Sequence, residues 1–219
     1  MSKDRKLVYG VGINDADYVV KKFEQDYSAR HISGRYKQRL VWMCPFYQKW
    51  VSMLERCYSE KYQEKYPTYK GCTVLEEWKL FSNFRKWVVG QDWEGMQLDK
   101  DVLFVGNKVY REETCVFVTR QVNMFLVDSG KTRGEWPIGV CWDKKSKKFL
   151  SNCSNPFTGK REHLGHFDCP QEAHKAWLSK KLEHAYALAA IQTNPLVAIA
   201  LIERYENYVS DVDTIPNVT

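Results

Sequence analysis

The sequence predicts an α+β fold, in which a helical N-terminal part with a ββα core is followed by a three-stranded antiparallel sheet packed on a helix. Apolar residues recur at helical spacing between residues 45 and 89. Short apolar runs bounded by turn residues follow near residue 100 and again after residue 136. The predicted divisions are an N-terminal arm (1–43), a core (44–129), a linker (130–135), a sheet-plus-helix module (136–194) and a C-terminal helix with a tail (195–219).

The composition indicates a chain that can bury a sizeable core. Of its 219 residues 44% are hydrophobic, and eight Trp, thirteen Tyr and ten Phe are spread along it. The net charge of +6 favours a polyanionic partner, although mild basicity also serves solubility alone. Seven cysteines without a Cys-x-x-Cys pair indicate reduced thiols, and no apolar run has the length of a membrane span. We therefore expect a cytoplasmic protein without a membrane partner.

The first 43 residues predict an extended arm or a short strand. Its basic run, Ser28 to Arg39, could contact phosphates or form a solvated flexible segment.

Two amphipathic helices are predicted next. The first begins at Pro45, a residue suited to a first helical position, and places Trp50 and Leu54 on its apolar face. The second spans residues 76–89, and both aromatic stripes indicate a buried scaffold. Residues 61–71 between the helices predict a loop.

Residues 97–126 predict two strands and a short helix. Leu98 and the apolar run 102–105 indicate the first strand, and Gly106-Asn107 indicates a tight turn. A second strand takes in residues 109–110 and 115–118. Thr119 is placed to cap the helix that follows.

The last third of the chain predicts three short strands and two helices. The strands span 137–142, 149–154 and 161–167, and one helix runs from Pro170 to about residue 191. Pro195 ends that pattern, and a further amphipathic helix is expected over 196–209.

Four segments in the middle of the chain carry a resemblance to a known family. They are Leu98-Asp99-Lys100-Asp101, Gly106-Asn107-Lys108-Val109-Tyr110, Glu113-Thr114-Cys115-Val116-Phe117-Val118 and Gln121-Val122-Asn123. Together they resemble the core of phage HNH-type homing endonucleases. The resemblance implies a ββα-metal site that cleaves double-stranded DNA by nicking one strand. It implies Mg²⁺ or Mn²⁺ as the cofactor, with Asp99 and Asn123 as its oxygen ligands.

Two catalytic positions depart from the family pattern. Lys100 stands where the family has its general-base His, and Thr114 stands where the family has the Asn that orients this base. Lys100 then either clamps a phosphate while water bound to the metal attacks, or the site no longer cuts. A simpler alternative is that Asp99, Asp101 and Asn123 only cap turns.

The C-terminal module resembles the ethylene-response-factor type of DNA-binding domain, through Gly139-Val140-x-Trp142, Leu164-Gly165-x-Phe167 and Glu172-Ala173. That resemblance implies three strands in the major groove with one helix behind. Eight basic and three acidic residues lie between Gly130 and Gly165, although a solvated lysine loop is an alternative. The expected DNA contacts are Arg133, Trp142, Lys144, Lys145, Lys147, Lys148, Asn152, Lys160 and Arg161.

A zinc site is a weaker hypothesis. His163, His166 and Cys169, with Cys153, have intervals that suit zinc, but a strand followed by a helix explains the same residues.

The favoured function is a metal-dependent DNA endonuclease. The alternatives are a catalytically inactive DNA-binding or regulatory protein on the same core, and a protein-binding inhibitor that uses its aromatic-rich helices.

Overall fold

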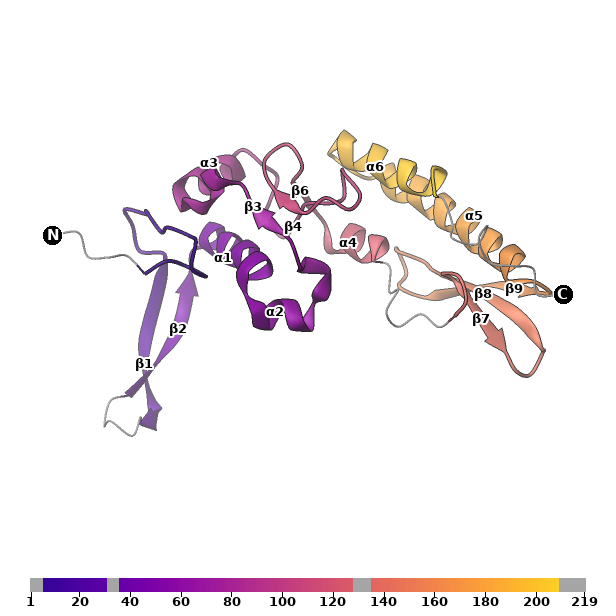
Figure 1. Ribbon diagram of the computed structural model, residues 1–219, viewed down its shortest axis with the longest axis horizontal. Coiled ribbons are helices and arrows are strands. Elements are labelled where there is room, and N and C mark those ends of the chain that lie inside the picture. Colours follow the sequence, from indigo (N-terminus) through magenta and orange to yellow (C-terminus); the bar gives the residue numbers. More distant parts are fainter. Residues whose placement is uncertain (1–5, 31–35, 128–134, 209–219) are drawn as a thin grey trace. The chain divides into compact units, whose positions relative to one another are not determined.

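The computed structural model describes residues 6–30, 36–127 and 135–208, and it confirms the α+β class (Figure 1). The chain forms two compact units, Met1–Phe117 and Val118–Thr219, which are described separately. None of the helices in the described part has the length and apolar content needed to cross a lipid bilayer. All seven cysteines are free thiols.

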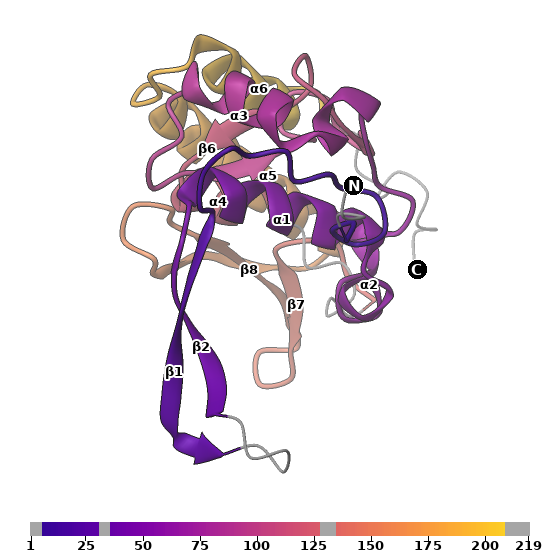
Figure 2. The same ribbon diagram turned by 90° about the vertical axis from the view of Figure 1, so that its left-hand side faces the viewer.

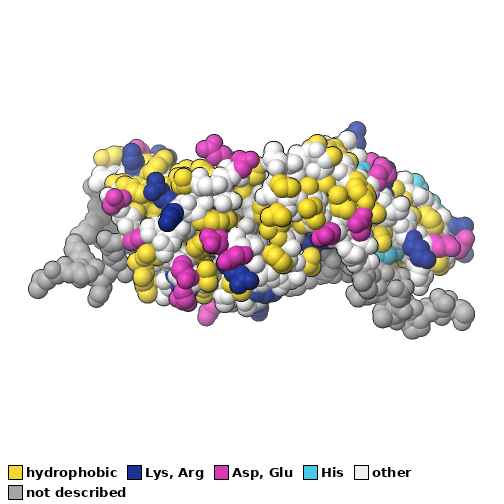
Figure 3. Space-filling view, turned by 90° about the horizontal axis from the view of Figure 1, so that it is seen from above, with side chains coloured by type: hydrophobic (Ala, Val, Ile, Leu, Met, Phe, Trp, Pro, Cys, Tyr) yellow, Lys and Arg dark blue, Asp and Glu magenta, His cyan; other side chains and the backbone are white. Residues whose placement is uncertain are grey.

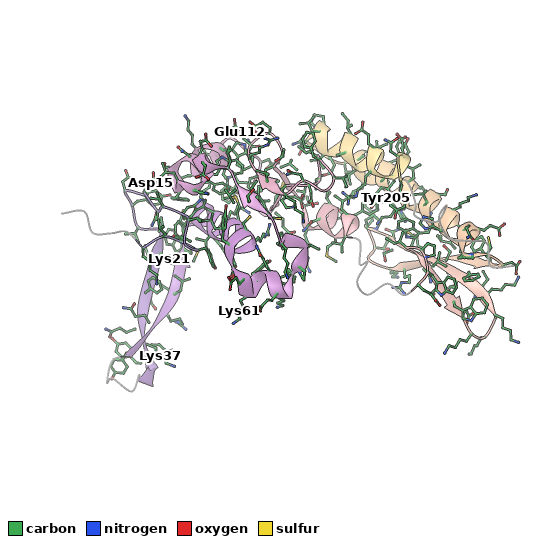
Figure 4. The ribbon with its side chains drawn as sticks, in the orientation of Figure 1. Asp15, Lys21, Lys37, Lys61, Glu112 and Tyr205 are labelled. Carbon is green, nitrogen blue, oxygen red and sulfur yellow. The ribbon has the colours of Figure 1, made fainter. Side chains whose placement is uncertain are left out.

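Unit 1 carries a long two-stranded ribbon where the sequence suggested only an arm or a short strand. Strand β1 (Lys21–Arg30) pairs antiparallel with β2 (Tyr36–Met43), and the ribbon projects away from the helices of the unit (Figure 1). It twists along its length (Figure 2), and every residue of β2 except Met43 is exposed. Lys21 marks its base and Lys37 lies toward its tip (Figure 4).

The two faces of this ribbon differ in chemistry because side chains alternate along a strand. Between residues 23 and 27 of β1 one face is uncharged, and the rings of Tyr27 and Tyr36 meet at its end with their centroids 4.9 Å apart. The other face carries opposite charges across the strands. The registered pairs are Phe23–Leu40 and Gln25–Gln38 on the first face, and Glu24–Arg39 and Asp26–Lys37 on the second.

Helix α1 (Pro45–Tyr58) confirms the first predicted helix and forms the centre of the unit 1 core. Trp50 is fully buried, and its indole N–H donates to the carbonyl of Trp78 at 2.7 Å. Gly12 lies against this ring so closely that an added Cβ would come within 2.9 Å of it. Gly12 therefore has a packing explanation, whereas Gly10 is required by its positive φ of 77°.

The second predicted helix is interrupted by a contact that is distant in sequence. A 3-10 turn η2 (Glu76–Lys79) precedes helix α3 (Phe81–Val89), and Leu80 between them is extended. Ile13 inserts there, since its N–H donates to Lys79 and its carbonyl accepts from Phe81. The predicted loop was wrong at residues 61–65, which belong to helix α2 (Glu60–Lys65). A 3-10 turn η1 (Pro67–Tyr69) follows this helix.

The predicted strand–strand–helix order is present, with different strand bounds. Strand β4 (Gln97–Asp99) pairs with β6 (Val116–Val118), and helix α4 (Arg120–Leu126) follows, capped by the Thr119 hydroxyl. The short strands β3 (Thr73–Val74) and β5 (Val109–Tyr110) pair in parallel. Residues 102–105 were wrongly assigned to a strand, because they form a bend in which Phe104 and Val105 are exposed.

Unit 2 confirms the three-stranded antiparallel sheet packed on a helix. Strands β7 (Val140–Asp143), β8 (Lys148–Ser154) and β9 (Arg161–Phe167) lie in the order β7-β8-β9, and helix α5 (Pro170–Ala189) packs against them. Helix α6 (Pro195–Glu206) packs on α5.

Close backbone approach explains the glycine before β7. Gly139 has a positive φ of 84°, and an added Cβ would come within 2.1 Å of the Trp177 ring on α5. Ser151 is fully buried beneath the helix, and its hydroxyl donates to the carbonyl of Ala173 at 2.7 Å.

Helix α4 belongs to unit 2 by its contacts. The Phe125 ring packs on Tyr205 of α6 with centroids 5.3 Å apart, and Lys181 of α5 donates to the Phe125 carbonyl at 2.7 Å. Tyr205, marked in Figure 4, donates to the same carbonyl. The compact units therefore divide after Phe117, within β6, and so before the linker predicted at 130–135.

Candidate metal and nucleic-acid sites

Asp99, the predicted metal ligand, ends strand β4 and organises the turn after it. Its Oδ1 accepts the backbone N–H groups of Asp101 at 2.8 Å and of Val102 at 3.0 Å. Such an Asx turn directs these two N–H groups away from strand pairing. This is the physical reason that residues 102–105 bend away from the strand direction.

The Asp99 carboxyl is half-buried and shares a hydrogen bond with the side chain of Asp101. Burial raises the pKa of the Asp99 carboxyl to about 6, and the hydrogen bond and charge of Asp101 add to the rise. The two backbone donors act in the opposite direction by stabilising the charged form. Sequence reasoning treated Asp101 only as a turn residue, although its i, i+2 spacing from Asp99 indicated a carboxyl pair.

Lys100, the residue in place of the family's His, is buried with only 5% of its surface exposed. Its ammonium lies 3.1 Å from Oδ2 of Asp101, on the side of the core that holds the thiols of Cys57, Cys72 and Cys115. In this position Lys100 balances the charge of the carboxyl pair. Its backbone carbonyl accepts from the side chain of Asn107, which closes the loop between β4 and β5.

Thr114, the residue in place of the family's base-orienting Asn, is buried with 4% exposure. Its hydroxyl donates to the carbonyl of Val109 at 3.0 Å and so fastens the turn between β5 and β6. Asn123, the second predicted metal ligand, is half-buried on α4 in unit 2. Asp99 belongs to unit 1.

Two carboxylates in unit 1 have the oxygen chemistry that a hard divalent ion prefers. Mg²⁺ commonly binds through one or two carboxylates and takes its other ligands from water and phosphate, and Asp99 and Asp101 fit that pattern by type. Within the described ranges, no three His, Cys, Asp or Glu side chains gather into a metal site.

The hypothetical zinc ligands have other partners. His163 and His166 lie ring to ring with centroids 5.1 Å apart, and His166 is 3.0 Å from the Asp143 carboxylate. Cys169 caps helix α5 by accepting the N–H of Glu172 at 3.4 Å, and Cys153 is buried in the sheet. A strand followed by a capped helix accounts for these residues.

The three-stranded sheet has one face on helix α5 and one open face. Ser151 and Cys153 point toward the helix, so alternation places Asn152 and Ser154 on the open face. The cross-strand partners of these two are His163 and Arg161, both exposed.

Trp142, expected at the DNA, lies on the other face. It is the cross-strand partner of Phe149, the two rings are 4.9 Å apart, and Phe149 is two residues from Ser151. Because 41% of its surface is exposed, the Trp142 side chain is only partly covered on this face of the sheet.

The predicted lysines line the turn between β7 and β8. Lys144, Lys145 and Lys147 are exposed there, and Asp143 holds the turn by accepting the Lys145 N–H and the Ser146 hydroxyl. These two donors and His166 lower the pKa of Asp143 to about 2. Lys148 pairs with Asp168 at 3.0 Å. Lys160 is exposed before β9, and Arg133 lies outside the described residues.

The aromatic stripes expected for a protein-binding inhibitor are not on the surface. Tyr47, Trp50, Trp78, Phe81 and Phe84 are each at most 4% exposed. Apolar side chains instead reach the surface on the ribbon, where Phe23 and Tyr27 are more than half exposed. They also reach it over α6 (Figure 3), where Leu196 and Ile199 are more than half exposed.

A scan against protein-family models and searches of curated proteins and solved structures found no match. Both family resemblances therefore rest on the motifs quoted above.

Proposed function

We propose that this protein binds double-stranded DNA through the open face of the β7–β9 sheet. The observation that supports this most is a three-stranded sheet covered by a helix on one side only. Its uncovered side carries Asn152, His163 and Arg161, beside an exposed lysine turn.

The chemistry of this face suits a duplex. Arg161 and the turn lysines neutralise phosphates, which supplies affinity without sequence preference. The amide of Asn152 offers both a donor and an acceptor to a base edge, which is the kind of contact that specifies sequence. Trp142 takes no part in base contacts in this proposal, because it lies on the helix-facing side.

A salt titration tests this function. The affinity of the full chain for a fluorescent duplex is measured by anisotropy over a series of KCl concentrations. We expect log Kd to rise steeply with log salt, and the slope to fall by about 2–3 when Lys144, Lys145 and Lys147 become Ala, since each phosphate contact contributes about 0.9.

A variant with Lys61, Lys65 and Lys70 changed to Ala is the matched control. It removes the same charge from exposed positions in unit 1 and should leave the slope close to that of the wild type. A wild-type slope near zero would refute DNA binding and favour a protein partner.

Metal-dependent cleavage of DNA is the second candidate function, and the Asp99–Asp101 carboxyl pair favours it. A divalent ion bound there supplies Lewis acidity toward a phosphate and a water molecule. The chain's own residues hold the carboxyl pair in its turn within unit 1. Because Lys100 is paired with Asp101, no side chain in this proposal acts as a general base. The absence of a general base lowers the cleavage rate by roughly 10²–10⁴-fold, so we expect slow nicking.

A plasmid assay tests cleavage. Supercoiled DNA is incubated with the wild type, with Asp99→Asn or with Asp17→Asn, an exposed position outside both proposed sites, in Mg²⁺ or Mn²⁺ and with a chelator as the blank. We expect nicked circles from the wild type and from Asp17→Asn, but not from Asp99→Asn. Intact plasmid in every lane would refute cleavage and favour the alternative of a DNA-binding or regulatory protein with an inactive core. We also propose that the protein acts on DNA in the cytoplasm of a host cell.

A further inference from the structure

A pocket of about 500 Å³ in unit 1 lies between α1 and the segment that leads into β4. This volume is within the range of small-ligand sites, which is roughly 300–1,000 Å³. Polar and charged side chains from α1 line one wall, and Trp93 and Gln97 line the other. The α1 residues are Gln48, Lys49, Ser52 and Arg56.

Lys49 and Arg56 are held in this pocket by neutral groups. Lys49 donates to the carbonyl of Met96 at 2.6 Å and lies 5.6 Å from the centre of the Trp93 ring. Arg56 donates from Nη1 to the carbonyl of Leu98 at 3.1 Å and to the Tyr110 hydroxyl at 3.5 Å. These contacts fix the positions of both cations. Because the acceptors are neutral, they do not neutralise either positive charge.

Within the part of the chain that the structure describes, no carboxylate pairs with either of these two charges. Of the ion pairs between described residues, none involves Lys49 or Arg56. Asp92 and Glu94 flank Trp93 in sequence but do not line the pocket. Asp99 follows Leu98, and its carboxyl is engaged by its own turn and by Asp101.

The two cations also repel each other. Both side chains are half-buried, and burial together with the charge of Arg56 lowers the pKa of Lys49. Like charges held close in a partly desolvated pocket are unfavourable, and an anion between them relieves the repulsion. A phosphate meets these requirements, because Arg and Lys are its usual partners.

We propose that this pocket binds a phosphate group through Lys49 and Arg56, with Gln48 and Ser52 as hydrogen-bonding neighbours. Both Arg56 hydrogen bonds in the described structure use Nη1, so its Nε and Nη2 groups remain for a ligand. The proposal that this pocket binds phosphate does not rest on the proposed function. Which molecule supplies the phosphate does rest on it. If the protein binds DNA, the bound phosphate belongs to the DNA backbone. It then lies beside Leu98, which is next to Asp99 in β4. A free phosphate is the other source.

The experiment follows the indole N–H signal of Trp93 in ¹⁵N-labelled full-length protein, assigned with Trp93→Phe. Sodium phosphate replaces sodium chloride at constant ionic strength. We expect a saturable shift in the wild type, an affinity at least about 10-fold weaker in Lys49→Gln, and no change in the matched variant Lys61→Gln. Arg56→Lys keeps the charge while losing the guanidinium geometry, and should bind phosphate more weakly than the wild type.

A second arm adds a short duplex in place of phosphate. A shift of the Trp93 signal that is lost in Lys49→Gln assigns the pocket to a DNA phosphate. A response to inorganic phosphate alone keeps the pocket but assigns it to a free ligand. If neither addition moves the signal, or if Lys49→Gln responds like the wild type, the phosphate site is wrong. DNA binding by the β7–β9 sheet is judged separately from its salt slope.

Discussion

The carboxyl group of Asp99 holds a proton more tightly in the folded protein than in the unfolded chain. Its pKa is raised from 3.8 to about 6. A raised folded-state pKa means that this group contributes stability that is fully present below the unfolded pKa and is lost as the pH rises through the folded pKa. Unit 1 is therefore less stable at pH 7 than at pH 4 by up to roughly 3 kcal/mol from this group.

Asp99→Asn should reverse this loss. The Asn side-chain oxygen can still accept both backbone N–H groups of the turn, while the titrating carboxyl is gone. We expect the variant to be more stable than the wild type by about 1–3 kcal/mol at pH 7 and to show no gain at pH 4. Urea unfolding from pH 4 to pH 8, followed by tryptophan fluorescence, measures this difference.

Asp143→Asn provides the control of opposite sign. The folded-state pKa of Asp143 is lowered to about 2, so its carboxylate contributes stability above the unfolded pKa of 3.8 that is lost as the pH falls through 2. This variant should lose stability at pH 7. An equal, pH-independent change in both variants would contradict the assignment of the Asp99 shift.

At single positions the sequence identified residues but not their surroundings. The departure at Lys100 from the family's His was plain from the motif, and it raised the question of a missing base. Its burial against Asp101 depends on the fold of the loop to Asn107, which no local pattern encodes. The face of the sheet on which Trp142 lies was not predictable for a similar reason, because its strand register relative to Phe149 decides where it points.

Among the elements, the β1–β2 ribbon contributes least to the core. The buried core residues Val20 and Cys44 flank it in sequence, at its base. An isolated two-stranded hairpin is marginally stable in water, so the ribbon gains little from its own pairing.

Replacing Lys22–Trp42 by Asn-Gly should therefore leave unit 1 folded. Lys21 and Met43 are cross-strand partners, and Asn-Gly is the preferred two-residue turn between such residues. We expect the free energy of unfolding to change by less than about 1 kcal/mol in urea titrations. Phe23→Ala on the ribbon should have a similarly small effect, whereas Phe81→Ala in the core should cost about 3–5 kcal/mol. A large loss from the ribbon replacement would show that it supports the core.

Elements with a local signal were predictable, and elements made by distant contacts were not. Pro45 and Pro170 each begin a helix whose apolar periodicity is visible in sequence, and the three strands of unit 2 are separated by clear turns. The sequence of the ribbon contains a Ser33-Gly34 turn signal, but its long strands, rich in charged and polar residues, were not predicted. The break at Leu80 is produced by Ile13. The bend over 102–105 is set by one carboxylate rather than by the apolar run itself.

For the whole molecule, the position of the boundary between units has a measurable consequence. The Phe125 side chain is 4% exposed, and it packs on Tyr205 within unit 2. A fragment of residues 118–219 should unfold cooperatively. A fragment of residues 130–219, cut at the predicted linker, should be less stable by about 3 kcal/mol or more, since it lacks this ring.

Thermal unfolding followed by circular dichroism compares the two fragments. Phe125→Ala in the longer fragment should reproduce most of the difference. Equal stability of the two fragments would place the boundary at the linker after all.

The order of elements along the chain also determines the time between synthesis of the ribbon and synthesis of the rest of unit 1. Once residues 21–43 have left the ribosome, a hairpin can pair within about 1–10 μs. The rest of unit 1, up to Phe117, takes roughly 4 to 15 s longer at about 5–20 residues per second. Throughout that interval Phe23, Tyr27 and Leu40 face solvent beside a nascent chain with no core. This exposed aromatic surface is where a chaperone, or another nascent chain, would first meet the protein.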